Sequence, residues 1–158
     1  MKIIVYIQSS EGKINPISLE SLVVAQELKK SKLAEVYAAT FCANIASQLI
    51  AYDIDGVMHI SDENLSSYSP LHYIEAFNQL HSMHSPDLIM FGHTYETRDW
   101  VPRLSARLDI PFLSDCIGMN IDETITFTRS LYQNKINTDL SVSSKSAIVS
   151  FQSGAYKI

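Results

Sequence analysis

The sequence has little of what disulfide-stabilised or metal-bound folds rely on. Its 158 residues include two cysteines, Cys42 and Cys116, which lie far apart and in no spacing typical of a metal or redox site. This usage favours two buried, reduced thiols over a disulfide, in a cytosol-like compartment. The chain contains no internal repeat, low-complexity tract or linker, so we expect one domain over residues 1–158.

Long apolar runs and basic clusters are also missing. The longest apolar run near the start, Ile3–Ile7, is far shorter than a signal segment of ~7–15 residues or a membrane span of ~20. Twelve lysines and arginines against seventeen acidic residues give a net charge of -5, and the basic residues are scattered. We therefore expect no membrane insertion, no nucleic-acid partner and a cytoplasmic location.

The remaining composition is that of a globular domain, with 46% hydrophobic and 18% charged residues. Short apolar runs alternate with amphipathic stretches as far as Leu108, which is typical of parallel strands crossed by helices. The expected strands are Lys2–Gln8, Ala34–Phe41, Gly56–Ile60 and Asp87–Gly92, and the expected helices are Ser18–Lys30, Asn44–Tyr52, Pro70–His84 and Thr97–Leu108.

Single residues fix the expected helix ends. Ser18 and Thr97 are predicted to cap their helices, and Gly56 is predicted to supply a left-handed exit after the second helix. In that second helix the inward residues are expected to be Ile45, Leu49 and Ile50.

The pattern changes to a period of two after Pro111, which predicts hairpin-connected strands. These strands are Phe112–Ile121, Thr124–Leu131, Ile136–Val142 and Ala147–Phe151. The predicted fold class is therefore α/β: a doubly wound, mostly parallel sheet, extended at one edge by antiparallel C-terminal strands.

A doubly wound sheet places ligands at the carboxyl ends of its strands, so we searched the loops there for phosphate cradles. The loop SSEGKINP after Gln8 has one glycine and matches neither the dinucleotide-binding nor the P-loop pattern. The loop Gly92–Asp99 leads into a helix start and is the better anion candidate. We nevertheless favour a structural role, in which Asp99 complements the helix dipole, and Arg98 and Arg103 form surface or interface ion pairs.

Other chemistry is not supported by residue spacing. His81 and His84 lie one helical turn apart with His72 upstream, but no third metal ligand is evident, so a solvated helix face is expected. The segment Ser114-Asp115-Cys116 has no nucleophile elbow and is interpreted as a strand edge or turn. Two acidic pairs, Asp53 with Asp55 and Asp122 with Glu123, lie in turn-like segments. We therefore predict no catalytic, cofactor-binding or metal-ligating residues.

The stretch PDLIMFGHTYETRDWVPRLSARL, from Pro86 to Leu108, resembles the alpha subunit of electron transfer flavoprotein in its N-terminal domain. The residues that carry the resemblance there are Gly92, Arg98, Asp99, Pro102, Arg103, Ala106, Arg107 and Leu108. Similar stretches are Gly12 to Glu20, Ser114-Asp115, Thr128 to Tyr132 and Val149 to Tyr156. Two departures are Thr97, where the family has glycine, and Gln133-Asn134-Lys135, where a hairpin requires Asn134 to be left-handed.

The resemblance implies an adenine nucleotide alpha hydrolase-like fold and an electron carrier, not an enzyme. It implies a heterodimer with a beta subunit, which accepts electrons from flavin dehydrogenases through FAD. The family's FAD contacts lie mostly in a C-terminal domain that the sequence to Ile158 does not include. We thus expect a structural and docking domain that binds neither FAD nor AMP alone, and that self-associates without its partner. An adenine-nucleotide-binding module of the same fold is the alternative, and a small hydrolase is a third, less favoured hypothesis.

Overall fold

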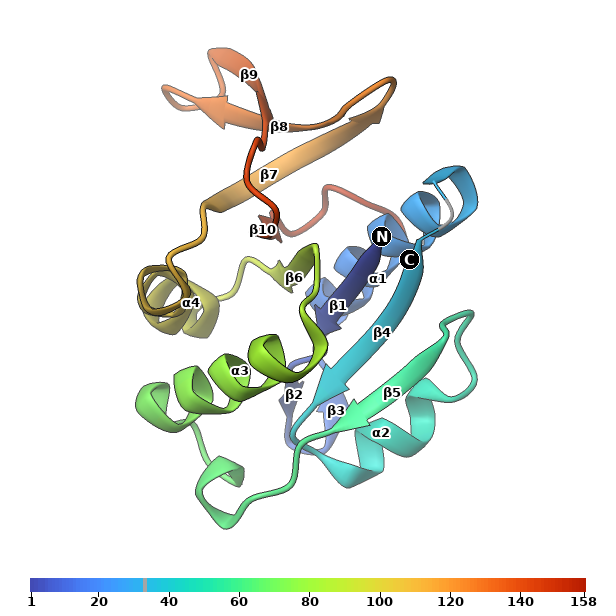
Figure 1. The fold of residues 1–158 in the computed structure, drawn as a ribbon, viewed down its shortest axis with the longest axis vertical. Helices are drawn as coiled ribbons and strands as arrows, with labels where there is room; N and C mark the ends of the chain where they lie inside the picture. The colour runs from blue at the N-terminus through green and yellow to red at the C-terminus, as the bar shows by residue number, and fades with distance from the viewer. Residues whose placement is uncertain (33) are drawn as a thin grey trace.

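The computed structural model describes residues 1–32 and 34–158, and these form a sheet covered by helices on both faces (Figure 1). Within the described residues the main sheet has eight strands. Their order is β5 (Gly56–His59), β4 (Glu35–Thr40), β1 (Lys2–Tyr6), β6 (Leu88–Gly92), β10 (Ala147–Phe151), β7 (Phe112–Ile121), β8 (Ile125–Leu131) and β9 (Ile136–Ser141). The strands from β5 to β7 pair in parallel, whereas β7, β8 and β9 pair antiparallel.

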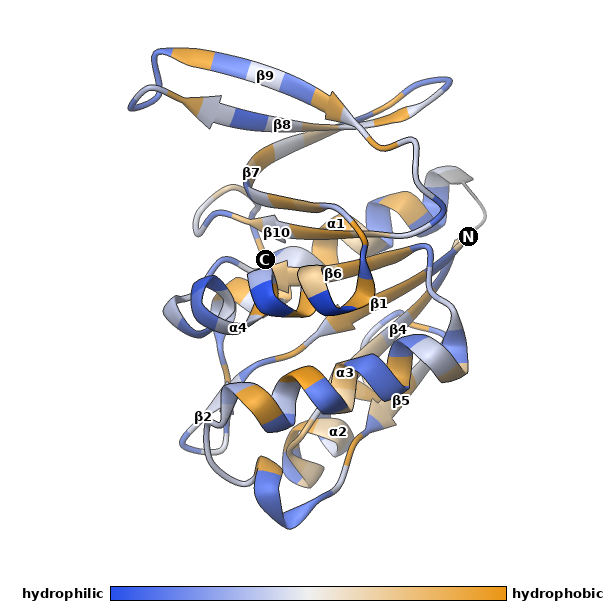
Figure 2. Cartoon of the chain, turned by 60° about the vertical axis from the view of Figure 1, so that its left-hand side comes forward, coloured by the Kyte–Doolittle hydropathy of each residue, from blue (hydrophilic) through white to orange (hydrophobic). Residues whose placement is uncertain are grey.

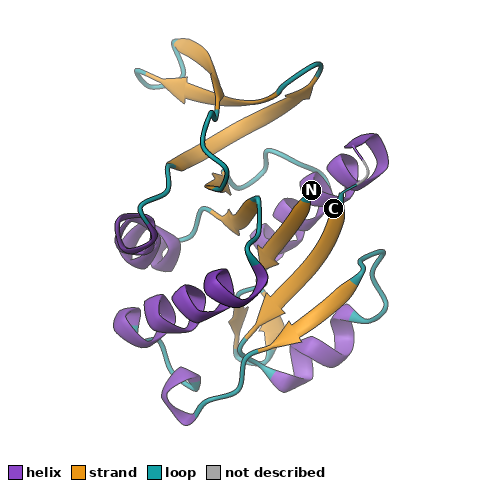
Figure 3. Cartoon of the chain, viewed as in Figure 1, coloured by secondary structure: helices purple, strands orange, loops and turns teal. Residues whose placement is uncertain are grey.

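The helices are divided between the two faces of the sheet (Figure 3). The helices α1 (Pro16–Lys32) and α2 (Ala43–Leu49) pack with one core cluster, and α3 (Pro70–His84) and α4 (Tyr95–Leu108) pack with the other. In β1, Ile3 and Val5 belong to the first cluster, whereas Ile4 and Tyr6 belong to the second. The predicted doubly wound α/β class is therefore confirmed.

The central strands form because both of their faces are buried. The strands β6 and β10 are buried at every residue, and β1 is buried at all residues after Lys2. Continuous apolar runs are typical of such parallel strands. Figure 2 shows β1 and β6 as hydrophobic over most of their length, whereas β8 and β9 mix hydrophobic and polar residues.

An aromatic cluster fixes α4 against the sheet. The ring of Trp100, which is fully buried, lies 5.2–5.8 Å from the rings of Tyr6, Tyr73, Phe77 and Phe91. Aromatic pairs of this kind contribute about 0.5–1.5 kcal/mol each beyond the burial of their surface. The cluster therefore holds α4 against this face of the sheet.

The strands β7, β8 and β9 form an arm that extends away from the helices (Figure 1). The arm was predicted correctly, including its hairpin at Tyr132, Gln133 and Asn134, all of which have positive φ. The strand β10 does not belong to it. It lies between β6 and β7 and pairs with both in parallel, so the end of the chain returns to the middle of the sheet.

The predicted cap of the first helix was wrong by three residues. The helix α1 begins at Pro16, and Asn15 precedes it with its Oδ1 accepting from the Ile17 amide at 3.3 Å. Ser18 instead lies buried inside the helix, where its Oγ accepts from the Gln8 amide at 3.1 Å. Pro is favourable in a first turn because its missing N–H would have no partner there.

The end of α2 also differs from the prediction. Ile45 and Leu49 are buried as expected, but Ile50 is 76% exposed because it lies beyond the last helical turn. Gly56 begins β5 and is not a left-handed cap. A Cβ at Gly56 would lie 3.1 Å from the ring of Tyr37, so a larger residue there would require the ring to shift by a few tenths of an ångström.

Candidate functional site

The candidate site is a crevice at the carboxyl ends of β1 and β6, where the strand order reverses. The chain leaves β1 toward α1 on one face and leaves β6 toward α4 on the other. This divergence opens the crevice in which doubly wound sheets place their ligands. It holds a cavity of about 540 Å3, lined by Asn15, Pro16, Ile17, His93, Thr94, Tyr95, Arg98 and Ser153.

Gly92 sets how closely the two helix starts approach each other. A Cβ at this residue would lie 2.7 Å from a methyl carbon of Ile17 and 3.0 Å from the Ile17 carbonyl carbon and oxygen. Such contacts are not tolerated, so only glycine allows β6 to end directly against the first turn of α1. The residue-level resemblance at Gly92 therefore has a steric explanation.

Threonine hydroxyls hold the start of α4. Thr94, and not Thr97, is the N-cap: its Oγ1 accepts from the Thr97 amide at 3.1 Å and donates to Gln8 Oε1 at 2.8 Å. Thr97 is buried in the first turn and donates to the Gly92 carbonyl at 2.7 Å. The predicted cap was therefore three residues too late. The observed cap, Thr94, also joins α4 to Gln8 at the end of β1.

One of the two ion pairs predicted at α4 is present within the described chain. Arg103 pairs with Asp99, which also accepts a hydrogen bond from the Tyr68 hydroxyl. Among the described residues Arg98 has no carboxylate partner, and its guanidinium carbon lies 5.7 Å from the centre of the Tyr95 ring. Arg98 therefore contributes an uncompensated positive charge at the mouth of the crevice.

Sequence reasoning missed a polar cluster at the back of the crevice. His93 Nδ1 lies 2.9 Å from Ser150 Oγ, which also accepts from the Asp115 amide at 3.1 Å. His93 Nε2 lies 3.9 Å from the Asp115 carboxylate. Burial lowers the pKa of His93, and the positive charges of Arg98 and Arg129 lower it too, whereas Asp115 acts in the opposite direction.

This cluster does not form a hydrolytic triad. Ser150 is fully buried, so its Oγ cannot reach a substrate carbonyl. The neighbouring thiol of Cys116 is buried as well, and burial raises its pKa to about 12. Because thiolates are the reactive form of cysteine, Cys116 is poorly suited to nucleophilic chemistry.

The loop after β1 uses its glycine for a turn. It forms a two-stranded ribbon of β2 (Ser9–Ser10) and β3 (Lys13–Ile14), with Glu11 and Gly12 at φ values of 52° and 73°. Positive φ at both central residues is the geometry of a tight hairpin turn. The glycine is thus part of a hairpin, and the loop lacks the successive glycines of a pyrophosphate cradle.

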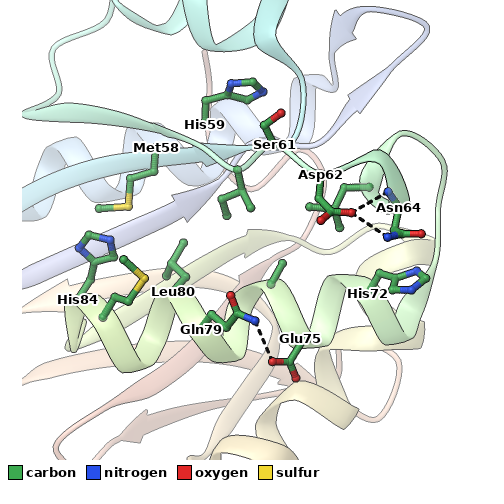
Figure 4. A pocket seen from close by; sticks show the side chains of 14 residues that line it. Met58, His59, Ser61, Asp62, Asn64, His72, Glu75, Gln79, Leu80 and His84 are labelled. Atoms are coloured by element: carbon green, nitrogen blue, oxygen red, sulfur yellow. Dashed lines mark hydrogen bonds between the residues drawn. The ribbon is translucent and has the colours of Figure 1, made fainter.

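A second cavity, of about 410 Å3, lies between the end of β5 and α3 (Figure 4). Met58 and Leu80 line its wall, and His72 and His84 lie at opposite ends of the same face of α3. His72 Nδ1 lies 2.9 Å from Ser69 Oγ, and His81 Nε2 lies 3.3 Å from Ser146 Oγ. The histidines do not converge, and the part of the chain that the structure describes contains no cluster of three metal-ligating side chains.

One of the two acidic pairs contacts structural groups, and the other lies in a turn. Lys29 lies 3.2 Å from both Asp53 and Asp55. The Val36 amide donates to Asp55, and this hydrogen bond together with Lys29 lowers the pKa of Asp55. Asp122 and Glu123 lie in the turn between β7 and β8.

The outer strand of the arm is the remaining candidate surface. In the described sheet β9 is an edge strand that pairs only with β8. Two exposed apolar side chains lie at this edge: Tyr132 is 74% exposed, and Ile136 is 52% exposed. Unpaired edges next to exposed apolar groups favour association with another chain. As for membranes, no described helix is both long and apolar enough to span a bilayer.

Comparison with known proteins identifies the family of the chain. The family model of the electron transfer flavoprotein domain matches residues 3–158. The chain is 30% identical over 122 residues to the electron transfer flavoprotein subunit alpha of Thermoanaerobacterium thermosaccharolyticum, covering 75% of this chain and 37% of that one. It is 27% identical over 136 residues to the alpha subunit of Bacillus subtilis, covering 85% and 42%.

A third relative carries a different name. The lactate dehydrogenase (NAD(+),ferredoxin) subunit LctC of Acetobacterium woodii is 28% identical over 124 residues, covering 77% of this chain and 30% of that subunit. The chain thus spans well under half the length of these relatives. Because the family model matches nearly the whole chain, the chain belongs to the electron transfer flavoprotein domain family.

Proposed function

We propose that residues 1–158 form the N-terminal structural and docking domain of an electron transfer flavoprotein alpha subunit. In this role the domain pairs with a beta subunit and supports electron transfer from flavin dehydrogenases to an acceptor. The FAD that carries the electrons is bound outside this domain, and the protein acts in the cytoplasm as a carrier, not as an enzyme.

The observation that carries the proposal is the family match from residue 3 to residue 158, together with an unpaired β9 edge. The polar residues at α4 have structural partners: Thr94 caps the helix, and Arg103 pairs with Asp99. The edge strand and its exposed Ile136 supply the surface on which a second subunit can dock. These features need no catalytic residue in this chain.

The proposal is tested by co-expression with the cognate beta subunit. We expect a one-to-one complex by size-exclusion chromatography with light scattering, and self-association of the chain when it is expressed alone. Flavin absorbance at stoichiometric strength is expected only when a C-terminal flavin domain is also supplied. The chain alone should be colourless and release no AMP on heating.

A pair of matched variants locates the interface. Ile136→Lys places a charge on the exposed edge of the arm, and Leu71→Lys places one on α3, where Leu71 is 71% exposed. Burying an unpaired charge in an interface costs several kcal/mol, so we expect Ile136→Lys to weaken the complex at least about tenfold. Leu71→Lys should leave it unchanged. Equal effects of the two variants would show that the interface is not at the β9 edge, whereas AMP released at one per chain would favour the adenine-nucleotide module instead.

A further inference from the structure

The geometry points to a proton-sensitive joint: His93, Ser150 and Asp115 lock the antiparallel arm to the parallel sheet while His93 is neutral, and protonation of His93 releases the lock. The joint is a property of the chain alone. It does not depend on the docking role proposed above.

The three residues meet where the arm begins. His93 directly follows β6, Ser150 lies in β10, and Asp115 lies in β7, so three adjacent strands are joined. The register of β7 shifts at this point, both against β10 and against β8. Asp115 has a φ of 59°, a left-handed conformation that is unfavourable for most residues with a side chain. The hydrogen bond from its amide to Ser150 helps to hold that conformation.

The hydrogen-bond network is complete when the imidazole is neutral and its Nδ1 is the acceptor. Ser150 Oγ accepts from the Asp115 amide, so its own hydroxyl proton remains to be donated to His93 Nδ1 at 2.9 Å. In this state His93 Nε2 carries the ring proton and faces the Asp115 carboxylate at 3.9 Å. The Ser150 hydroxyl proton and the Asp115 amide proton then each have an acceptor.

Protonation removes the acceptor that Ser150 uses. An imidazolium has protons on both ring nitrogens and accepts no hydrogen bond. Ser150 Oγ would then face two donors, the His93 Nδ1–H and the Asp115 amide, and its own hydroxyl proton would lose its partner. Ser150 is fully buried, so water cannot replace that partner in the closed structure. A buried donor without an acceptor is destabilising, so the strands are expected to separate here.

The surrounding charges set the pH at which this happens. The groups that face His93 are Asp115 from β7, Arg129 from β8 and Arg98 from α4. Burial and the two arginines disfavour the imidazolium, and Asp115 favours it, with a net lowering of the pKa. The joint is therefore closed above the ordinary histidine value of about 6.5 and opens only below it.

The sign of the effect on stability follows. Because the folded-state pKa of His93 lies below its unfolded value, protons bind preferentially to the open or unfolded chain. Stability from the joint is complete above the unfolded pKa, declines as the pH falls through the interval between the two values, and is constant below the folded pKa. Within this interval the open population rises by at most about tenfold per pH unit, since one proton is taken up.

The test is an NMR titration of the full chain between pH 4 and 8, combined with amide hydrogen exchange at Asp115 and Gln152. Gln152 reports on the same joint, because its amide donates to the Cys116 carbonyl. We expect His93 to titrate below about 6.5, and both amides to lose protection in step with it, after correction for the intrinsic pH dependence of exchange.

Variants separate the joint from ordinary burial. Ser150→Ala removes the donor to Nδ1 and should raise the midpoint of His93, Asp115→Asn should lower it, and Arg98→Gln should raise it. Arg107→Gln is the matched control on α4, since Arg107 pairs with Glu75 and is not among the charges that face His93. If Asp115→Asn raises the midpoint, or if the two amides keep their protection while His93 titrates, the joint is refuted. The proposed docking role fails separately, if Ile136→Lys leaves the complex intact.

Discussion

A buried carboxylate in α1 holds the final segment of the described chain, and its removal is the sharpest test of the packing. Glu20 is 7% exposed, and its carboxylate accepts from the Gly154 amide at 2.8 Å and from the Tyr156 amide at 3.3 Å. Gly154 has a φ of 82°, so the chain turns through a conformation that favours glycine as it reaches this carboxylate. The ring of Tyr156 then packs edge-on against Phe151, with 5.7 Å between centroids.

The expected cost of Glu20→Ala follows from these contacts. Hydrogen bonds to a charged group contribute about 1.5–3 kcal/mol each. The Gly154 amide belongs to an exposed residue and can bind water after the change, so its share is smaller. We therefore expect the free energy of unfolding to fall by about 2–3 kcal/mol, and Glu20→Gln, which keeps one acceptor oxygen, to cost about half as much.

Urea denaturation of the two variants measures these values. A second readout uses Tyr156, whose pKa burial raises to about 12. Release of the segment should return the phenol toward its ordinary value of about 10, which absorbance at high pH detects. A loss below about 0.5 kcal/mol for Glu20→Ala, typical of a surface substitution, would refute the reasoning. So would an unchanged Tyr156 titration in a destabilised variant.

Three further predictions concern the core and the crevice. Gly92→Ala should destabilise the fold by more than about 2 kcal/mol in urea denaturation, whereas Gly118→Ala, whose Cβ would meet its nearest atom at 3.6 Å, should cost less. Thr94→Ala should cost about 1 kcal/mol and increase hydrogen exchange at the Thr97 amide, because it removes the cap of α4. Cys116, with a pKa raised to about 12 by burial, should resist alkylation at pH 8 until urea unfolds the chain, and rapid labelling of the native protein would contradict its burial.

Much of the fold could be predicted from the sequence because its signals are local. Period-two runs located β7, β8 and β9, and Pro70 marked the start of α3. The caps were less predictable. Asn15, Ser18, Thr94 and Thr97 are all suitable capping residues. In the folded chain Asn15 and Thr94 accept from first-turn amides, whereas Ser18 and Thr97 lie inside their helices and bind the Gln8 amide and the Gly92 carbonyl. These contacts exist only in the folded sheet.

The placement of β10 could not be predicted from its residues. Its run of apolar side chains fits an edge strand or a central one, and only burial of all five residues between β6 and β7 distinguishes them. A parallel strand in the middle of the sheet needs partners on both sides, and these come from parts of the chain far apart in sequence.

The polar cluster at the crevice depends on that same strand placement. Ser150 meets His93 and Asp115 only because β10 lies beside both β6 and β7. If β10 had extended the outer edge of the arm beyond β9, Ser150 would lie four strand spacings from β6, roughly 19 Å at the usual spacing of strands. The insertion of β10 thus has two effects: it joins the arm to the parallel sheet, and it places a buried hydroxyl against the single histidine that follows β6. A site of this kind has no motif, because its members share a position in the folded sheet and no spacing in the sequence.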